Sequence, residues 1–255
     1  MKTVIFCGGK GTRIRDVRSD VPKPMVEISG TPILLHLMQF YARAGFSDFV
    51  LCLGYKGDVI REFFTRNTEH SVAHEVRVRH DEFIEVPTSP TSWNVALIET
   101  GLETLTGGRL RRAQPYIGNE SFMLTYGDGL SDINLQKLVA HHKRLGKLLT
   151  VSGVRPPSRF GELSVEGDTV VGFNEKPQAS SGLISGGFFV AEPKIFSYLG
   201  DTDNTMLERE PMELLVVNRA VGVFRHDGFW QCMDTYRDWE FLNDLASKGD
   251  APWLI

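Results

Sequence analysis

The sequence is poor in cysteine: it has three among 255 residues, at positions 7, 52 and 232. Each lies in or beside an apolar segment, and the three form neither a CxxC pair nor an even-numbered set. We therefore expect a reducing compartment rather than secretion. No apolar run approaches membrane-spanning length, and no signal-peptide pattern precedes the first apolar run, so the cytoplasm is the expected location.

The sequence also lacks an excess of either charge. Lys and Arg total 28 and Asp and Glu total 32, a formal net charge of −4, which gives no reason to expect a partner among nucleic acids or membranes. The cations are therefore best interpreted locally, as ligands of phosphate. The seven histidines form no metal constellation, and no Ser-His-Asp or Cys-His arrangement is legible.

A strand that opens into a glycine-rich loop stands at the start of the chain. The apolar residues 3–7 lead into Gly8-Gly9-Lys10-Gly11-Thr12-Arg13, and Lys23 follows ten residues later. Glycines let backbone N–H groups approach a ligand without interference from a Cβ atom. Arg13 offers a planar fork to phosphate oxygens and Lys23 a compact point charge, so this segment suits a triphosphate.

Three other interpretations of this loop are possible. A dinucleotide-binding loop needs the spacing G-x-G-x-x-G, which the chain lacks, and no acidic residue follows at the ribose position. A Walker loop needs Gly-Lys-Ser/Thr, but Gly11 precedes Thr12-Arg13. An ordinary glycine-rich surface turn stays open for the Gly-x-Gly spacing alone, although the two cations argue against it.

Hydrophobic periodicity predicts an α/β protein with a mainly parallel sheet flanked by helices. Expected strands cover residues 3–7, 49–53, 76–80, 95–98, 122–126, 149–152, 162–165, 170–174, 184–190 and 221–226. Expected helices cover residues 58–66, 109–116, 135–145, 193–198, 209–217 and 238–246, and another begins with Thr31 as N-cap and Pro32 as first residue and ends at Gly45. Residues 106–108 are expected to form a turn and residues 81–92 a loop. We expect one domain, 1–255, without a separable second unit.

Two aspartates occupy positions where ligands could gather. Asp128 lies just past a buried strand, between two glycines, at the sheet edge where ligands of open α/β folds bind. A plain turn aspartate fits that position equally well. Asp234 follows an apolar stretch, and it could instead cap the helix that begins near Thr235.

Several motifs together carry a resemblance to a known family. They are GGKGTR at residues 8–13, PKPMVEI at 22–28, GYKG at 54–57, TGGR at 106–109, TYGDG at 125–129, EKP at 175–177, GGFF at 186–189, and GFWQCMDT at 228–235. In this order, over essentially the whole chain, they resemble the sugar-phosphate nucleotidylyltransferases, and within that family the members that use CTP and glucose 1-phosphate.

The resemblance implies roles for particular residues. The implied catalytic residues are Arg13, Lys23 and Asp128, and the implied Mg²⁺ ligands are Asp128 and Asp234. The implied nucleotide-binding residues are Phe6, Cys7, Gly8, Gly9, Lys10, Gly11, Thr12, Arg13, Lys23, Thr104, Arg109 and Gly127, with Thr104 and Arg109 at the pyrimidine. The implied sugar-phosphate-binding residues are Tyr126, Gly161, Glu175, Lys176, Ser185 and Gly186. Residues 1–150 would mainly bind the nucleotide and residues 151–255 the sugar phosphate.

The chain departs from the family pattern at three places. Phe6-Cys7 stands where Leu-Ala is usual, Lys10 replaces an apolar residue, and Ser185 replaces an asparagine. The resemblance implies transfer of a cytidylyl group to glucose 1-phosphate, in the supply of CDP-linked deoxysugars for surface polysaccharide, by a homo-oligomer. The rivals are the same reaction with UTP, dTTP or another sugar 1-phosphate, and a nucleotide-sugar binding module without turnover.

Overall fold

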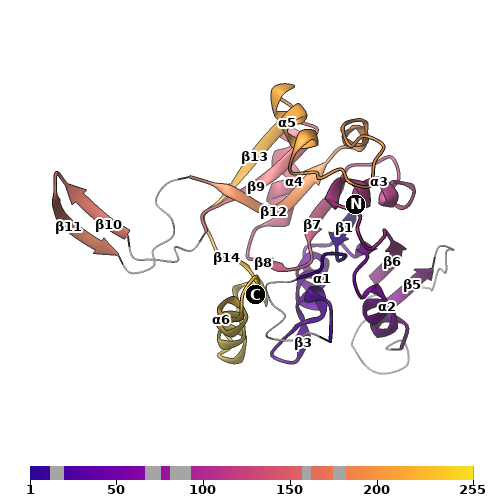
Figure 1. The fold of residues 1–255 in the computed structure, drawn as a ribbon, viewed down its shortest axis with the longest axis horizontal. Coiled ribbons are helices and arrows are strands. Elements are labelled where there is room, and N and C mark those ends of the chain that lie inside the picture. The colour runs from indigo at the N-terminus through magenta and orange to yellow at the C-terminus, as the bar shows by residue number, and fades with distance from the viewer. Residues whose placement is uncertain (12–19, 67–75, 81–92, 157–161, 175–181, 255) are drawn as a thin grey trace.

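The computed structural model describes residues 1–11, 20–66, 76–80, 93–156, 162–174 and 182–254. Its centre is an eight-stranded sheet in the order β13-β9-β12-β7-β1-β4-β6-β5 (Figure 1). These strands are β1 (Lys2–Phe6), β4 (Asp48–Leu53), β5 (Val76–His80), β6 (Trp93–Glu99), β7 (Phe122–Tyr126), β9 (Leu149–Val154), β12 (Ile184–Ala191) and β13 (Val221–His226). Within this sheet β12 runs antiparallel to its neighbours β7 and β9, and the other pairings are parallel. The expected mainly parallel α/β fold is confirmed.

Helices cover both faces of the sheet. Buried residues of α1 (Ile33–Arg43), α2 (Gly57–Arg66), α4 (Leu135–Leu145) and α6 (Tyr236–Ser247) join one apolar cluster, and those of α3 (Thr106–Ile117) and α5 (Glu210–Val217) join the other. Alternate residues of each central strand enter opposite clusters: in β1, Ile5 packs in the first and Val4 in the second. Burial on both faces explains why these strands are continuous apolar runs in the sequence. Among the described helices, none combines the length and apolar character that crossing a membrane requires.

Short elements complete the chain. The pairs are β2 (Glu27–Ile28) with β3 (Thr31–Pro32), β8 (Gly129–Ser131) with β14 (Trp230–Cys232), and β10 (Glu162–Glu166) with β11 (Thr169–Asn174). The 3-10 turns are η2 (Lys23–Met25), η3 (Pro193–Tyr198) and η4 (Pro252–Leu254). The β10–β11 hairpin, whose two strands the sequence predicted at residues 162–165 and 170–174, turns at Gly167-Asp168 and projects from the rest of the molecule (Figure 1).

Two local predictions are wrong. Thr31 does not cap α1, because it pairs with Ile28 in the β2–β3 ladder and Pro32 becomes the residue before the helix. Gly107 and Gly108 do not form a turn, because α3 already begins at Thr106. A Cβ atom on Gly107 would lie 2.7 Å from Thr205 Cγ2, so these glycines allow the segment at residues 203–205 to pack directly on the first turn of α3.

Candidate active site

A cavity of about 500 Å³ opens at the carboxyl ends of β1 and β7. The loop after β1, the segment before α3, and Met206 form its walls. Ten of the residues predicted to bind the nucleotide line it: Phe6, Cys7, Gly8, Gly9, Lys10, Gly11, Lys23, Thr104, Arg109 and Gly127. The structure thus brings together segments separated by more than a hundred residues, whereas Thr12 and Arg13 lie outside the described residues.

The side chain of Arg109 fixes the loop after β1 by hydrogen bonds. Arg109 is 5% exposed, and its guanidinium donates to the carbonyls of Gly8 (3.0 Å) and Leu53 (2.9 Å) and to the hydroxyl of Thr100 (2.7 Å). A Cβ atom on Gly8 would lie 2.1 Å from Arg109 Nη1, so glycine is required there for a packing reason. A Cβ atom on Gly9 would face open space, which leaves the backbone on that side open to a ligand.

The opposite wall of the cavity is the segment between β6 and α3. Thr104 in this segment is buried, and Lys10 reaches across the mouth to Glu103 with a shortest distance of 2.7 Å. The segment is anchored by the backbone of Leu105, whose N–H donates to the carbonyl of Asp203. Lys10, which the resemblance placed among the nucleotide-binding residues, therefore forms an ion pair with Glu103 in this structure.

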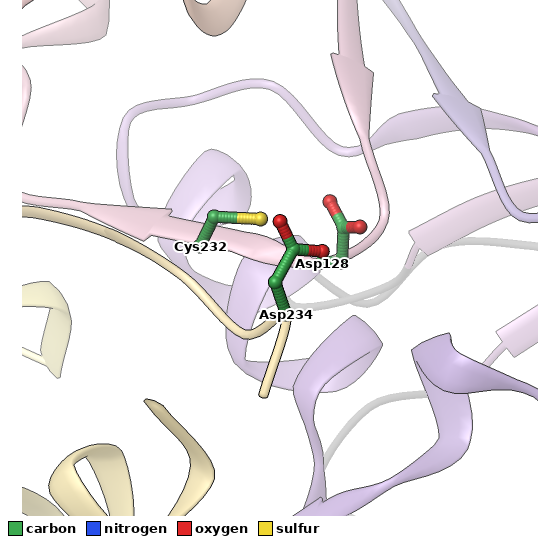
Figure 2. A group of neighbouring side chains, drawn as sticks. All are labelled: Asp128, Cys232 and Asp234. Carbon is green, nitrogen blue, oxygen red and sulfur yellow. The ribbon is translucent and has the colours of Figure 1, made fainter. Parts of the chain in front are cut away.

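Two carboxylates from distant parts of the chain meet at the floor of the cavity. Asp128 follows β7, and Asp234 follows β14, which pairs with β8 directly after Asp128. The N–H of Met233 donates to the carbonyl of Asp128 (2.9 Å), which fixes the two chain segments side by side. Figure 2 shows both carboxylates and the Cys232 thiol as neighbours. One ligand atom from each of the three lies within 4.8 Å of the other two.

Lys23 lies between these carboxylates. Its Nζ atom is 2.7 Å from Asp128 Oδ2 and 2.5 Å from Asp234 Oδ1, and the side chain is 11% exposed. Burial works to lower the pKa of Lys23, but the charge of Asp128 and hydrogen bonds to both carboxylates outweigh it, so the pKa lies above its ordinary value. The ammonium group is therefore charged at neutral pH and neutralises part of the acidic pair.

The thiols near the cavity are poor nucleophiles. Burial, followed by the nearby Cys52 and Asp128, raises the pKa of Cys7 well above its ordinary value. Burial and the charge of Asp128 likewise raise the pKa of Cys232. Since the thiolate is the reactive form, neither group is set up for nucleophilic catalysis.

The donor set suits magnesium. Asp128 and Asp234 supply oxygen, which Mg²⁺ prefers, and they are 26% and 33% exposed, so water can complete a coordination shell. Cys232 offers sulfur, which magnesium does not favour. The two carboxylates alone are the residues of this cluster that fit the predicted ion.

A second cavity of about 260 Å³ lies beside the first. Three residues predicted to bind the sugar phosphate line it: Tyr126, Ser185 and Gly186. Asp128 and Asp234 line both cavities, so the acidic pair stands at their junction. Gly161, Glu175 and Lys176 lie outside the described residues, so their predicted roles stay predictions.

Several residues of the site carried no signal of their own in the sequence. Met206 lines the first cavity, and Cys232 stands beside the acidic pair. Trp230 lines the second cavity and donates its indole N–H to the carbonyl of Gly186 (2.7 Å). Glu208 accepts the phenol hydrogen of Tyr126. Of these, Trp230 and Cys232 lie within the GFWQCMDT motif, which could have singled them out.

Known proteins resemble this chain over its whole length. The nucleotidyl transferase family profile matches residues 2–235. A probable glucose-1-phosphate cytidylyltransferase of Bacillus subtilis (strain 168) is 43% identical over 257 aligned residues, with 100% of both chains covered. The glucose-1-phosphate cytidylyltransferase of Salmonella typhi is 41% identical, with 99% of this chain and 98% of its own covered. Among solved structures, HddC from Yersinia pseudotuberculosis superimposes with a TM-score of 0.66 at 24% identity, covering 95% of this chain and 98% of its own. This structural likeness supports the fold.

Proposed function

Because this chain belongs to the nucleotidyl transferase family, we propose that it transfers the cytidylyl group of CTP to α-D-glucose 1-phosphate. The products are CDP-glucose and pyrophosphate. The observation that carries the proposal is the acidic pair, Asp128 and Asp234, at the junction of two cavities of unequal size. A reaction between two phosphate-bearing substrates needs a cavity for each substrate and charged groups at the place where the two substrates meet. Two relatives that cover the whole chain are named for this activity.

The proposed reaction is a direct displacement at phosphorus. An oxygen of the sugar phosphate attacks the α-phosphorus of CTP, a new P–O bond forms, and the bond to pyrophosphate breaks. Such a transfer asks the protein mainly for positioning and for stabilisation of charge. No thiol need take part, in keeping with the raised pKa values of Cys7 and Cys232.

On the nucleotide side, the backbone N–H groups of the loop after β1 would meet the triphosphate, and Arg13 would stabilise charge on it and on the leaving pyrophosphate. Lys23 would neutralise phosphate oxygens at the floor. Asp128 and Asp234 would hold Mg²⁺, which when bound supplies positive charge to the phosphates. In support of this role, the ammonium of Lys23 lies 2.7 Å from Asp128 Oδ2, beside the proposed metal ligands.

Selection of the base falls to the wall formed by Thr104 and Arg109. Both terminal nitrogens of Arg109 already donate to groups of the protein, so Arg109 serves the base by its remaining Nε–H or by holding the Gly8 backbone in place. Thr104 supplies a buried hydroxyl. A buried polar group left without a partner penalises the wrong base strongly.

On the sugar side, Tyr126, Ser185 and Gly186 would face the glucose in the smaller cavity. Glu175 would take sugar hydroxyls, Lys176 would take the phosphate, and Gly161 would let the backbone approach the sugar. In the proposed division, residues 151–255 supply all of these sugar-side residues except Tyr126, and residues 1–150 supply most of the nucleotide part.

The test is pyrophosphate release with glucose 1-phosphate and Mg²⁺ across CTP, UTP, dTTP, ATP and GTP in parallel. A strong preference for CTP supports the proposal. Activity with UTP or dTTP instead would keep the reaction and move the base assignment, with Phe6-Cys7 the first place to look. If no pyrophosphate is released with any of the five nucleotides, or with other sugar 1-phosphates, the chain is a binding module without turnover.

We also propose that the chain assembles with copies of itself. The β10–β11 hairpin exposes Val165, Val170 and Val171, each more than half exposed, while a two-stranded hairpin alone is marginally stable in water. A second copy that covers these valines would supply the missing apolar contacts. Light scattering should then give a mass above that of one chain, and Val170→Glu should lower it; a monomeric wild type would refute the proposal.

A further inference from the structure

The phenol of Tyr126 stands between the two cavities and lines both. Its ring packs against Phe6 and Phe189, with ring centroids 5.8 Å and 6.0 Å away. On another side it lies against Gly187, where a Cβ atom would come within 2.7 Å of the ring and where the backbone has φ +78°. The ring is thus a partition whose position decides how the two cavities meet.

Glu208 joins this partition to the first turn of α3. One of its carboxylate oxygens accepts the Tyr126 hydroxyl hydrogen, and the other accepts the Thr106 hydroxyl hydrogen at 2.6 Å. Thr106 is the first residue of α3 and lines the larger cavity. A single carboxylate therefore connects the wall of one cavity with the partition of both.

The same segment is tied down by its backbone. The N–H of Leu207 donates to the Thr106 hydroxyl (2.9 Å), and the carbonyl of Thr205 accepts from Gly107 (3.0 Å) and Gly108 (3.2 Å). Residues 203–208 thus cover the N-terminus of α3 and accept hydrogen bonds from its backbone N–H groups. Met206 from this segment lines the larger cavity. Glu208 is the member of the segment whose side chain also reaches Tyr126.

We propose that Glu208 is a positioning residue: its carboxylate fixes the Tyr126 ring relative to α3 and thereby sets the approach of the sugar phosphate to the nucleotide. The inference rests on the proposed transfer reaction. Attack at phosphorus depends on separation and alignment, and a misplacement of about 1 Å can cost about 10²-fold in rate. Glu208 itself is exposed and lies outside the linings of the two cavities, so it acts through its partners rather than on the substrates.

The test is a double-mutant cycle of Glu208→Ala and Tyr126→Phe. Because Glu208 is exposed, its removal leaves no buried void, and the variant should fold. Each single variant should lose about 10- to 100-fold in kcat/KM for glucose 1-phosphate, with a smaller change in the KM for CTP. The double variant should be no worse than either single one, because both changes break the same link.

Two further variants make the outcome decisive. Glu208→Gln can still accept from Tyr126 and donate to Thr106, so it should restore most of the activity. Glu210→Gln, two residues along and also exposed, is the matched control and should behave as wild type. Losses that multiply in the double variant, a glutamine variant as poor as the alanine variant, or single variants with wild-type kinetics would each overturn the inference.

Failure of the proposed function gives a different pattern. An inactive wild type refutes the transfer reaction, and in that case the same cycle is measured by Tm. Non-additive Tm changes for Glu208→Ala and Tyr126→Phe show the link without any turnover, whereas additive changes overturn it.

Discussion

Replacement of Lys23 by methionine removes one charge from the centre of the acidic pair and keeps the length of the side chain. The Lys23 side chain is 11% exposed, and its two partners are 26% and 33% exposed. Removing one partner of a buried ion pair costs about 3–5 kcal/mol, and the partial exposure of the carboxylates places this cluster near the lower end. For a chain of this size, about 3 kcal/mol lowers Tm by about 6 °C.

Magnesium should then distinguish the variant from wild type. In Lys23→Met the two carboxylates have lost their cation, so they should bind Mg²⁺ more tightly than in wild type, where the ammonium group competes. Since a ligand of the folded state stabilises it in proportion to RT ln(1 + [L]/Kd), Mg²⁺ should raise the Tm of the variant more than that of wild type. Turnover should still fall by about 10²- to 10³-fold, because a charge aimed at the phosphates is missing.

The assay for Lys23→Met is a thermal melt in EDTA and across a Mg²⁺ titration, with pyrophosphate release measured on the same samples. Lys194→Met, at an exposed position, is the matched control for loss of a lysine. Equal Mg²⁺-induced shifts in wild type and variant would refute the claim that Lys23 and the metal share these carboxylates. Near-normal turnover in the variant would refute the catalytic role of Lys23.

Three further changes test other parts of the site and the core. Asp234→Asn should lower turnover by about 10²-fold or more and raise the Mg²⁺ concentration needed for half-maximal rate, as a Mg²⁺ titration of the rate would show. Gly8→Ala should destabilise the fold by about 1–3 kcal/mol in urea unfolding, because the guanidinium beneath it must move, whereas Gly9→Ala, which faces open space, should be nearly neutral. His36 is held neutral, since burial lowers its pKa and Trp253 donates to its Nδ1 atom. Its folded pKa is below the unfolded value near 6.5, so stability should fall as pH drops below about 6.5, and His36→Gln should flatten that part of the stability profile.

The features predicted best from the sequence are the buried strands and the sheet edge at which their carboxyl ends meet. Buried parallel strands are apolar runs that end at glycine or a polar residue, and their carboxyl ends meet at one edge. The loop at Gly8 and the carboxylate of Asp128 follow β1 and β7, which are neighbours in the sheet, so their proximity could be expected from strand order. The helices of the first half were also predicted, because their apolar residues recur at the spacing that packs one face of a helix against the sheet.

Contacts between distant segments could not be predicted in this way. Arg109 looked like a cation in the first turn of a helix, where it is mildly unfavourable, but the space left by Gly8 and Gly54 admits its guanidinium beneath the loop. The Gly107-Gly108 pair was predicted to form a turn. These glycines instead allow residues 203–205 to pack against α3, and such packing leaves no local pattern in the sequence. Local rules describe what one segment prefers, whereas these positions are set by a second segment.

The placement of Asp234 shows that the site is built from both halves of the chain, although the sequence can be divided into two stretches. It is delivered by β14, a three-residue strand too short to show any periodicity, whose partner β8 begins directly after Asp128. That pairing carries a carboxylate from the end of the chain to the floor of both cavities, beside a lysine from the beginning. Glu208 likewise reaches from the second half to the wall of the larger cavity at Thr106. The proposed nucleotide and sugar-phosphate parts are therefore only stretches of sequence, because each cavity takes residues from both, and a fragment that ends near residue 150 would lack half of the acidic pair.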